Sequence, residues 1–274
     1  MKLSFLTLQF KRYPLETSFL MARRYGFDGI ELWGARPHAY PYDGDDALVR
    51  DILRWKREYG VEIPMYTPEL LAYPYNLASA LPREREETVA YLKRAARFCA
   101  AIECPGMLVS CDHPGYGRNA SEAWGDLVSG LREVCREADA LGVSVSMESL
   151  GPNTSPIVSR ADDLARLIAD VGVPSFGAML DMAIPPLAAE PMSEYLDKLG
   201  GRLRHVHLCG CDGIYETHLQ VAPGSGTISF ESFLPLLKAH GYDGWCSVEV
   251  LEPYFRDPEF YLSEAKRYLD GLLG

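Results

Sequence analysis

The chain has 274 residues, of which 47% are hydrophobic, and its formal net charge at pH 7 is −11. This length suits one α/β barrel, and no segment approaches the roughly 18 consecutive apolar residues of a membrane span. The acidic balance argues against nucleic acid and anionic membranes as partners, since both would repel the chain. The cysteines are seven, an odd number, and scattered. With no secretory pattern at residues 1–13, we expect reduced thiols and a cytoplasmic protein.

The first half of the chain alternates short apolar strands with amphipathic helical stretches, which predicts successive strand–helix units. The expected strands cover residues 3–8, 29–33, 61–66 and 107–110, and the helices that follow them cover 15–25, 47–59, 82–99 and 121–141.

The second half repeats the pattern more clearly. Its expected strands cover residues 143–148, 176–181, 203–207 and 245–249, and its helices cover 161–170, 192–199, 230–240 and 258–272. Eight units in order predict an α/β protein with a single (β/α)8 TIM barrel over residues 1–274. An open doubly wound sheet is the alternative, but it usually carries a Gly-rich phosphate loop after its first strand, and none follows Leu8.

Metal-type side chains stand at the ends of four consecutive predicted strands: Glu148, Asp181, His207 and Glu249. In such barrels the strand ends meet at the rim that carries the chemistry. One acid there would be unremarkable, because acids also serve solubility and helix capping. Burying three carboxylates together costs several kcal/mol each unless a cation neutralises them. We therefore predict that these residues bind a divalent metal, with Mn²⁺ expected and Mg²⁺, Co²⁺ or Zn²⁺ as alternatives.

The same four residues carry a resemblance to a known family. Their series resembles the metal site of the xylose-isomerase-like TIM-barrel superfamily of sugar isomerases and epimerases. The segments ELWGARPHAY, YTPE, AYPYN, HPGY, DKLG, RLRHVH and PGSG are similar to the fructoselysine 3-epimerase branch of the ketose 3-epimerases. The resemblance extends over essentially the whole chain.

The resemblance implies a reaction. A 2-ketose would chelate the metal through its C2 carbonyl and C3 hydroxyl oxygens, and the cation would stabilise the enediolate formed when the C3 proton leaves. Glu148 and Glu249 would be the catalytic pair, one removing the proton and the other returning it on the opposite face. Asp181 and His207 would serve as ligands alone. The implied partners are a small sugar or sugar-amine substrate and further copies of the chain in a homo-oligomer.

Two positions depart from the family pattern. Many ketose 3-epimerases carry a second glutamate six residues after the first metal glutamate, where this chain has Thr154. Many also carry a histidine three residues after the metal aspartate, where this chain has Ile184. Both side chains help to hold substrate hydroxyls in those relatives. Their replacement favours a modified sugar over a plain free ketohexose.

Further residues at or after the strand ends are candidates for substrate binding, with ordinary packing as the alternative for each. They are Trp33, His38, Tyr66, Glu69, His113, Tyr116 and His218. His205 is expected to be a buried structural histidine on the opposite side of its strand from His207. Cys209 and Cys211 are interpreted as loop thiols, since no second cysteine pair accompanies them.

Other functions remain open at this stage. A ketose–aldose isomerase would use the same proton transfer, and a keto-sugar dehydratase the same metal. An apurinic-site endonuclease can share this barrel, but it needs several zinc ions and a basic face. Six histidines and the net charge of −11 argue against it. A non-catalytic binder would not require two glutamates on opposing strands.

Overall fold

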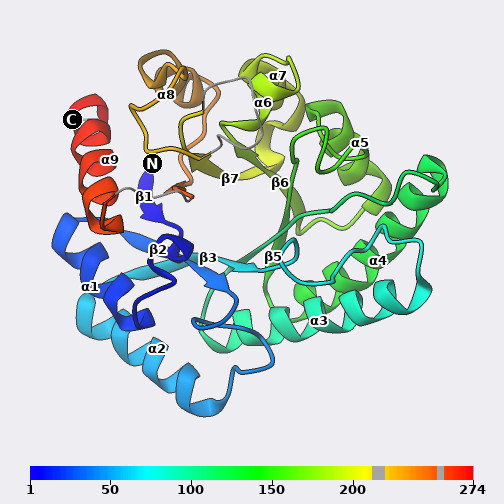
Figure 1. Ribbon diagram of the computed structural model, residues 1–274, viewed down its shortest axis with the longest axis horizontal. Helices are drawn as coiled ribbons and strands as arrows, with labels where there is room; N and C mark the ends of the chain where they lie inside the picture. Colours follow the sequence, from blue (N-terminus) through cyan, green and yellow to red (C-terminus); the bar gives the residue numbers. More distant parts are fainter. Residues whose placement is uncertain (212–219, 252–255, 274) are drawn as a thin grey trace.

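The computed structural model describes residues 1–211, 220–251 and 256–273. Within them, eight parallel strands form one sheet in the order β1-β8-β7-β6-β5-β4-β3-β2, and helices surround it (Figure 1). The predicted (β/α)8 barrel is confirmed.

The strands agree with the predicted ones to within a few residues. They are β1 Lys2–Phe5, β2 Gly29–Gly34, β3 Glu62–Pro68, β4 Gly106–Val109, β5 Ser144–Glu148, β6 Phe176–Asp181, β7 Leu203–Leu208 and β8 Trp245–Val248. The largest difference is at β1, predicted to reach Leu8. The chain turns there into the short 3-10 helix η1 (Thr7–Phe10), and the Thr7 hydroxyl accepts a hydrogen bond from the Trp33 backbone.

The helices lie on the outside of the barrel. The main ones are α1 Leu15–Tyr25, α2 Asp46–Tyr59, α3 Pro82–Ala101, α4 Ala120–Ala140, α5 Ala161–Val171, α7 Met192–Leu199, α8 Phe230–Ala239 and α9 Pro258–Leu273. The sequence analysis missed the four-residue α6 (Ile184–Leu187) and the short η2 (Gly200–Arg202). None of the described helices combines the length and the apolarity needed to cross a bilayer.

Local signals in the sequence fix where the helices start and stop. The Asp45 carboxylate accepts the Leu48 N–H at the start of α2, and Asn119 does the same for the first turn of α4. Gly60 ends α2 with φ of 65°, a left-handed conformation that glycine adopts without strain. These signals set the first turns of α2 and α4 and the last turn of α2.

The strands are buried on both faces, as expected for a parallel sheet covered by helices. Alternate residues point to the two sides: Met65 packs with Leu108 and Met179 inside the barrel, whereas Tyr66 packs against Phe98 of α3. This alternation selects which side chains can reach the interior of the carboxyl-terminal rim.

The barrel closes between β1 and β2. β1 pairs with β8 along its length, whereas the described ladder pairing on the β2 side is one parallel bridge between Leu6, which directly follows β1, and Glu31. Glu31 thus lies at the point where the two ends of the sheet meet.

Candidate metal centre

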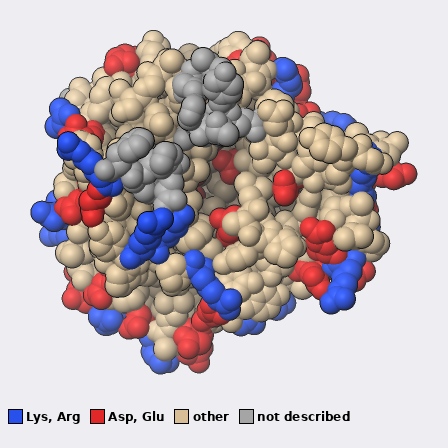
Figure 2. All heavy atoms as spheres, in the orientation of Figure 1, with Lys and Arg blue, Asp and Glu red and all other residues tan. Residues whose placement is uncertain are grey.

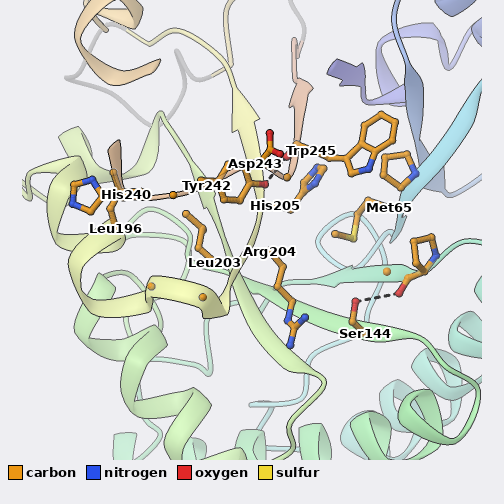
Figure 3. Close-up of a pocket in the computed structure, with 17 residues that line it drawn as sticks. Met65, Ser144, Leu196, Leu203, Arg204, His205, His240, Tyr242, Asp243 and Trp245 are labelled. Carbon is orange, nitrogen blue, oxygen red and sulfur yellow. Dashed lines mark hydrogen bonds between the residues drawn. The ribbon is translucent and has the colours of Figure 1, made fainter. Parts of the chain in front are cut away.

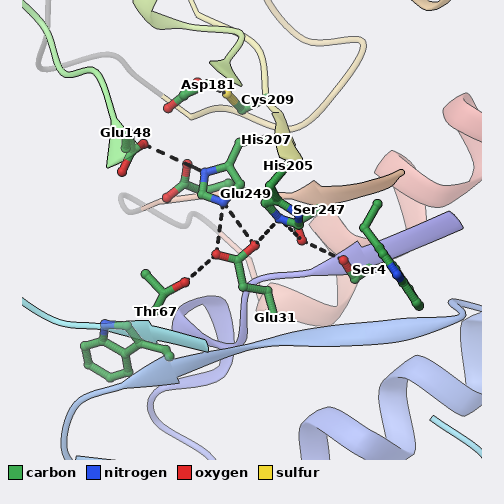
Figure 4. Close-up of polar contacts among 12 residues, drawn as sticks. Ser4, Glu31, Thr67, Glu148, Asp181, His205, His207, Cys209, Ser247 and Glu249 are labelled. Carbon is green, nitrogen blue, oxygen red and sulfur yellow. Dashed lines mark hydrogen bonds and ion pairs between the residues drawn. The ribbon is translucent and has the colours of Figure 1, made fainter. Parts of the chain in front are cut away.

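The four predicted metal-type side chains converge at the carboxyl-terminal rim. One ligand atom from each of Glu148, Asp181, His207 and Glu249 lies within 4.8 Å of all the others. Glu148 and Asp181 end β5 and β6, His207 is the next-to-last residue of β7, and Glu249 directly follows β8. All four are buried. Figure 4 shows Glu148 and Glu249 facing the His207 ring.

Without a cation, protons balance this acidic cluster. Burial raises the pKa of Glu148 well above its usual range and also raises that of Glu249. Burial lowers the pKa of His207, but the Glu31 and Glu249 carboxylates outweigh it and raise that pKa well above normal. His207 Nδ1 lies 2.9 Å from a Glu249 oxygen and 3.9 Å from a Glu148 oxygen. A divalent ion would replace these protons. Three carboxylates and one imidazole form a donor set that suits a divalent ion.

Asp181 is oriented by three donors. Its Oδ1 accepts from the Ala183 backbone at 2.7 Å and from the Cys209 thiol at 2.9 Å, and its Oδ2 accepts from the Gln220 amide at 2.7 Å. Burial raises the pKa of the Cys209 thiol well above normal, so it acts as a donor. Cys209 lies in the loop after β7, as the sequence predicted, and its thiol has the added role of orienting Asp181. Gln220 adopts a positive φ of 51°, and its amide Oε1 is buried with no hydrogen-bond partner among the residues that the structure describes.

Glu31 is a central residue that the sequence analysis did not single out. It lies in the middle of β2, completely buried, and its carboxylate accepts from Thr67 at 2.5 Å, from His205 at 2.8 Å and from His207 at 3.0 Å. His205 is buried as predicted, but its expected orientation is wrong. Residues two apart on a strand face the same side, so both imidazoles point to Glu31.

A pocket of about 430 Å³ opens above the cluster. Glu148 and Glu249 line its base, and Trp33, Glu69 and several leucines line its walls. The Trp33 indole N–H donates to Glu69 at 2.9 Å, and the other oxygen of Glu69 accepts from the Ala72 backbone. Figure 2 shows this face hollowed near its centre, with acidic atoms visible inside.

The comparisons with known proteins agree with this geometry. The family described as "Xylose isomerase-like TIM barrel" matches residues 19–272. The chain belongs to this family. It is 34% identical to the fructoselysine 3-epimerase of Escherichia coli O157:H7 over 273 residues, covering 100% of this chain and 98% of that protein.

Other members of the family are more distant. The inosose dehydratase of Salmonella typhimurium is 26% identical, over 90% of this chain and 85% of that protein. Among solved structures, the D-psicose 3-epimerase of Clostridium cellulolyticum H10 with D-tagatose has a TM-score of 0.85 at 16% identity, covering 100% of this chain and 99% of that one. The relatives and structural neighbours thus include several sugar epimerases, which are isomerases.

Four other predicted substrate residues lie in the described part of the chain, and none of them lines this pocket. His38 is buried behind Trp33, with its ring edge against the indole and its Nε2 3.1 Å from the Tyr13 carbonyl. Tyr66 is fully buried on the helix side of β3 and donates to the Ala39 carbonyl at 2.7 Å. Because side chains alternate along a strand, Tyr66 points toward α3 and not into the barrel interior.

The loop after β4 holds two more predicted residues. His113 Nδ1 accepts from the Gly115 backbone at 2.8 Å, and its ring packs on Tyr116, which is 99% exposed. Neither residue lines the pocket that contains Glu148 and Glu249. His218 lies outside the described residues.

A second pocket, of about 410 Å³, lies at the opposite end of the barrel (Figure 3). Its walls come from the first residues of several strands, among them Ser144, Leu203 and Trp245. Asp243 in its wall already pairs with the amino terminus at 2.7 Å. The acidic cluster lies instead at the carboxyl-terminal rim, which is where barrels of this kind generally carry their active sites.

Proposed function

We propose that this chain is a divalent-metal-dependent epimerase that inverts C3 of a 2-ketose. The observation that carries the proposal is the pair of buried carboxyls, Glu148 and Glu249, which both face Nδ1 of His207 and line one pocket. Inversion requires a proton donor and a proton acceptor on opposite faces of one carbon, and this pair would supply both to a sugar bound between them.

The roles of the residues follow from their positions. Glu148, Asp181, His207 and Glu249 would hold the metal, which supplies Lewis-acid stabilisation of developing negative charge when bound. Glu148 removes the C3 proton, and Glu249 delivers a proton to the other face. In the reverse direction the two exchange roles. Burial raises the pKa of both carboxyls, and this brings them closer to the range in which a carboxyl both accepts and donates protons.

The donor set also bears on the metal. Three carboxylates and one imidazole form an oxygen-rich site, which favours Mn²⁺ over a closed structural zinc. The seven cysteines, all within the described residues, are buried and form no disulfide, and they fit the reducing cytoplasm that we propose for the protein.

The charge of the pocket indicates the substrate class. Its charged lining residues are Glu69, Glu148 and Glu249, and no Lys, Arg or His belongs to the described lining. One divalent ion does not neutralise these acids together with Asp181. A cationic sugar, such as a ketose carrying an amine at C1, is therefore favoured over a phosphorylated one. The similarity to a fructoselysine 3-epimerase supports this choice, and Glu69 is the carboxylate that would face the ammonium group.

The test is solvent exchange in D₂O. The Mn²⁺-loaded protein is incubated with fructoselysine or with free ketohexoses, the metal is removed with chelator, and the sugars are analysed by NMR. Deuterium at C3 together with the C3 epimer is the expected result. Deuterium at C1 with an aldose product would instead identify an isomerase. No exchange with any sugar, despite bound metal, would contradict the proposal.

A second candidate rests on the inosose dehydratase relative. A dehydratase would use the same metal and base but would expel a hydroxyl instead of returning a proton. Loss of water from the sugar, seen by mass spectrometry in the same incubations, would identify that reaction.

A further inference from the structure

We propose that Glu31 is a positioning residue that fixes the His207 ring so that Nδ1 faces the metal. This inference rests on the proposed metal-dependent function, although its test measures metal binding and not turnover. Glu31 contributes no atom to the group formed by Glu148, Asp181, His207 and Glu249. It acts through His207 alone.

The two nitrogens of the His207 ring face different partners. Nε2 lies 3.0 Å from both oxygens of Glu31, and Nδ1 lies toward Glu249 and Glu148 (Figure 4). An ionised carboxylate only accepts hydrogen bonds, so Nε2 must carry a proton. The lone pair of Nδ1 is then the one available to a cation, once the cation displaces the proton shared with Glu249. Metal-binding histidines are commonly held in this way by a carboxylate behind the ring.

Glu31 is completely buried, and its carboxylate is surrounded by side chains that can donate hydrogen bonds to it. Thr67 donates to one of the two oxygens that face His207, and His205 lies against the other. A buried carboxylate with three donors is satisfied, and it would be costly without them.

A chain of hydrogen bonds holds Glu31 in place from behind. His205 Nε2 lies 2.8 Å from Glu31 and 3.0 Å from the Ser247 hydroxyl, which lies 2.6 Å from the Ser4 hydroxyl. These residues come from β7, β8 and β1 and are all buried. The closed barrel therefore sets the position of the Glu31 carboxylate and, through it, the direction of the His207 ring.

Glu31, His205 and His207 also form a second group with metal-type spacing. Their contacts of 2.8–3.0 Å have the length of hydrogen bonds between nitrogen and oxygen, so each is already satisfied by a proton. We therefore assign this group to positioning, and a stoichiometry of one metal per chain is the corresponding expectation.

The first experiment compares Mn²⁺ binding to the wild type, Glu31→Gln and the control Tyr66→Phe. A glutamine oxygen can accept from one imidazole, but its NH₂ group opposes the other, so the ring of His207 loses its fixed tautomer. We expect Glu31→Gln to weaken Mn²⁺ binding, measured by electron paramagnetic resonance, by about 10–100-fold. Tyr66→Phe also removes a buried hydrogen bond, on the helix side of β3, and should leave the Mn²⁺ affinity unchanged.

The thermal midpoints of the metal-free proteins separate positioning from stability. A merely structural Glu31 would lower the midpoint and leave the affinity of the folded fraction equal to that of the wild type, and this result would overturn the proposal. Two Mn²⁺ ions per wild-type chain would overturn it as well. The measurement involves no sugar, so its outcome is independent of whether the chain proves to be an epimerase.

A second measurement needs no variant and covers the case in which Glu31→Gln does not fold. Wild-type protein with ¹⁵N-labelled histidine is loaded with diamagnetic Zn²⁺, and long-range ¹H–¹⁵N spectra assign each ring nitrogen. We expect His207 to carry its proton on Nε2 and to show a metal-bound shift on Nδ1. The opposite assignment would contradict the proposal.

Discussion

The two halves of the barrel rim are built differently. At or next to the ends of strands β5 to β8 lie Glu148, Asp181, His207 and Glu249, which are all buried and each offer one ligand atom within 4.8 Å of the others. Strands β2 to β4 instead bring Trp33, the Glu69 loop and leucines to the same pocket. The β5–β8 side is suited to bind one cation and to transfer one proton, whereas the β2–β4 side offers shape, apolar area and a single carboxylate. We infer that the β5–β8 side determines the chemistry and that the β2–β4 side determines which substrate binds.

The largest expected effect on turnover comes from substitutions on the β5–β8 side of the rim. Glu148→Gln and Glu249→Gln each keep the size of the side chain but remove its ability to carry a proton, so we expect C3 exchange to fall by about 10²–10⁴-fold. Deuterium incorporation measures the loss, and circular dichroism checks the fold. Exchange at near wild-type rates in either variant would contradict the assigned pair.

The pH dependence of metal binding tests the metal ligands on the same β5–β8 side of the rim. The pKa values of His207, Glu148 and Glu249 are raised in the metal-free protein, so a cation competes with protons for these three groups. Mn²⁺ affinity should therefore fall as the pH is lowered, by about tenfold per pH unit for each proton displaced. Calorimetry in buffers of different ionisation heat counts the released protons. An affinity that is constant from pH 8 to pH 6 would show that no proton is displaced.

A substitution on the β2–β4 side should have a smaller effect, which is limited to KM for one class of substrate. Glu69→Gln keeps the hydrogen bond to Trp33 possible but removes the charge, so we expect KM for an amine-bearing ketose to rise about tenfold, an estimate of a single charge interaction at a partly exposed site. KM for a neutral ketose should remain unchanged. Equal effects on both substrates would show that Glu69 does not recognise the amine.

The smallest effect on turnover is expected for Tyr66→Phe. This residue lies on the helix side of β3, and its hydroxyl bonds the Ala39 carbonyl. Removing the hydroxyl should cost about 1–3 kcal/mol of unfolding free energy, because a buried acceptor loses its partner. KM and kcat should not change. Chemical denaturation and steady-state kinetics measure the two quantities, and a shift in KM alone would place Tyr66 at the substrate.

The sequence predicted those residues of the site that lie at the ends of strands. A parallel barrel gathers those ends at one rim, so Glu148, Asp181, His207 and Glu249 could be brought together without coordinates. Glu31 was missed because it lies in the middle of a strand, where only side-chain alternation reveals it. An acid inside the apolar run GIELW was the available signal, and applying the same alternation to Tyr66 and His205 would have corrected both.

Loop residues were beyond this reasoning. His38 and His113 follow strands in sequence, but their placement depends on turns and on contacts with Tyr13, Trp33 and Gly115. The donors to Asp181 depend on how the chain returns after β7. Such positions are decided by packing between segments that are distant in sequence, and no periodic pattern encodes them.

The bridge between Leu6 and Glu31 has a consequence for the order of folding. Glu31 contributes its backbone to the bridge at the β1–β2 closure and its side chain to His207, which is 176 residues away along the chain. Contacts of such long sequence separation form late, because a large loop must first be closed. Full metal affinity is therefore acquired only when the first and last strands have met, so Mn²⁺ uptake during refolding would time the closure of the barrel.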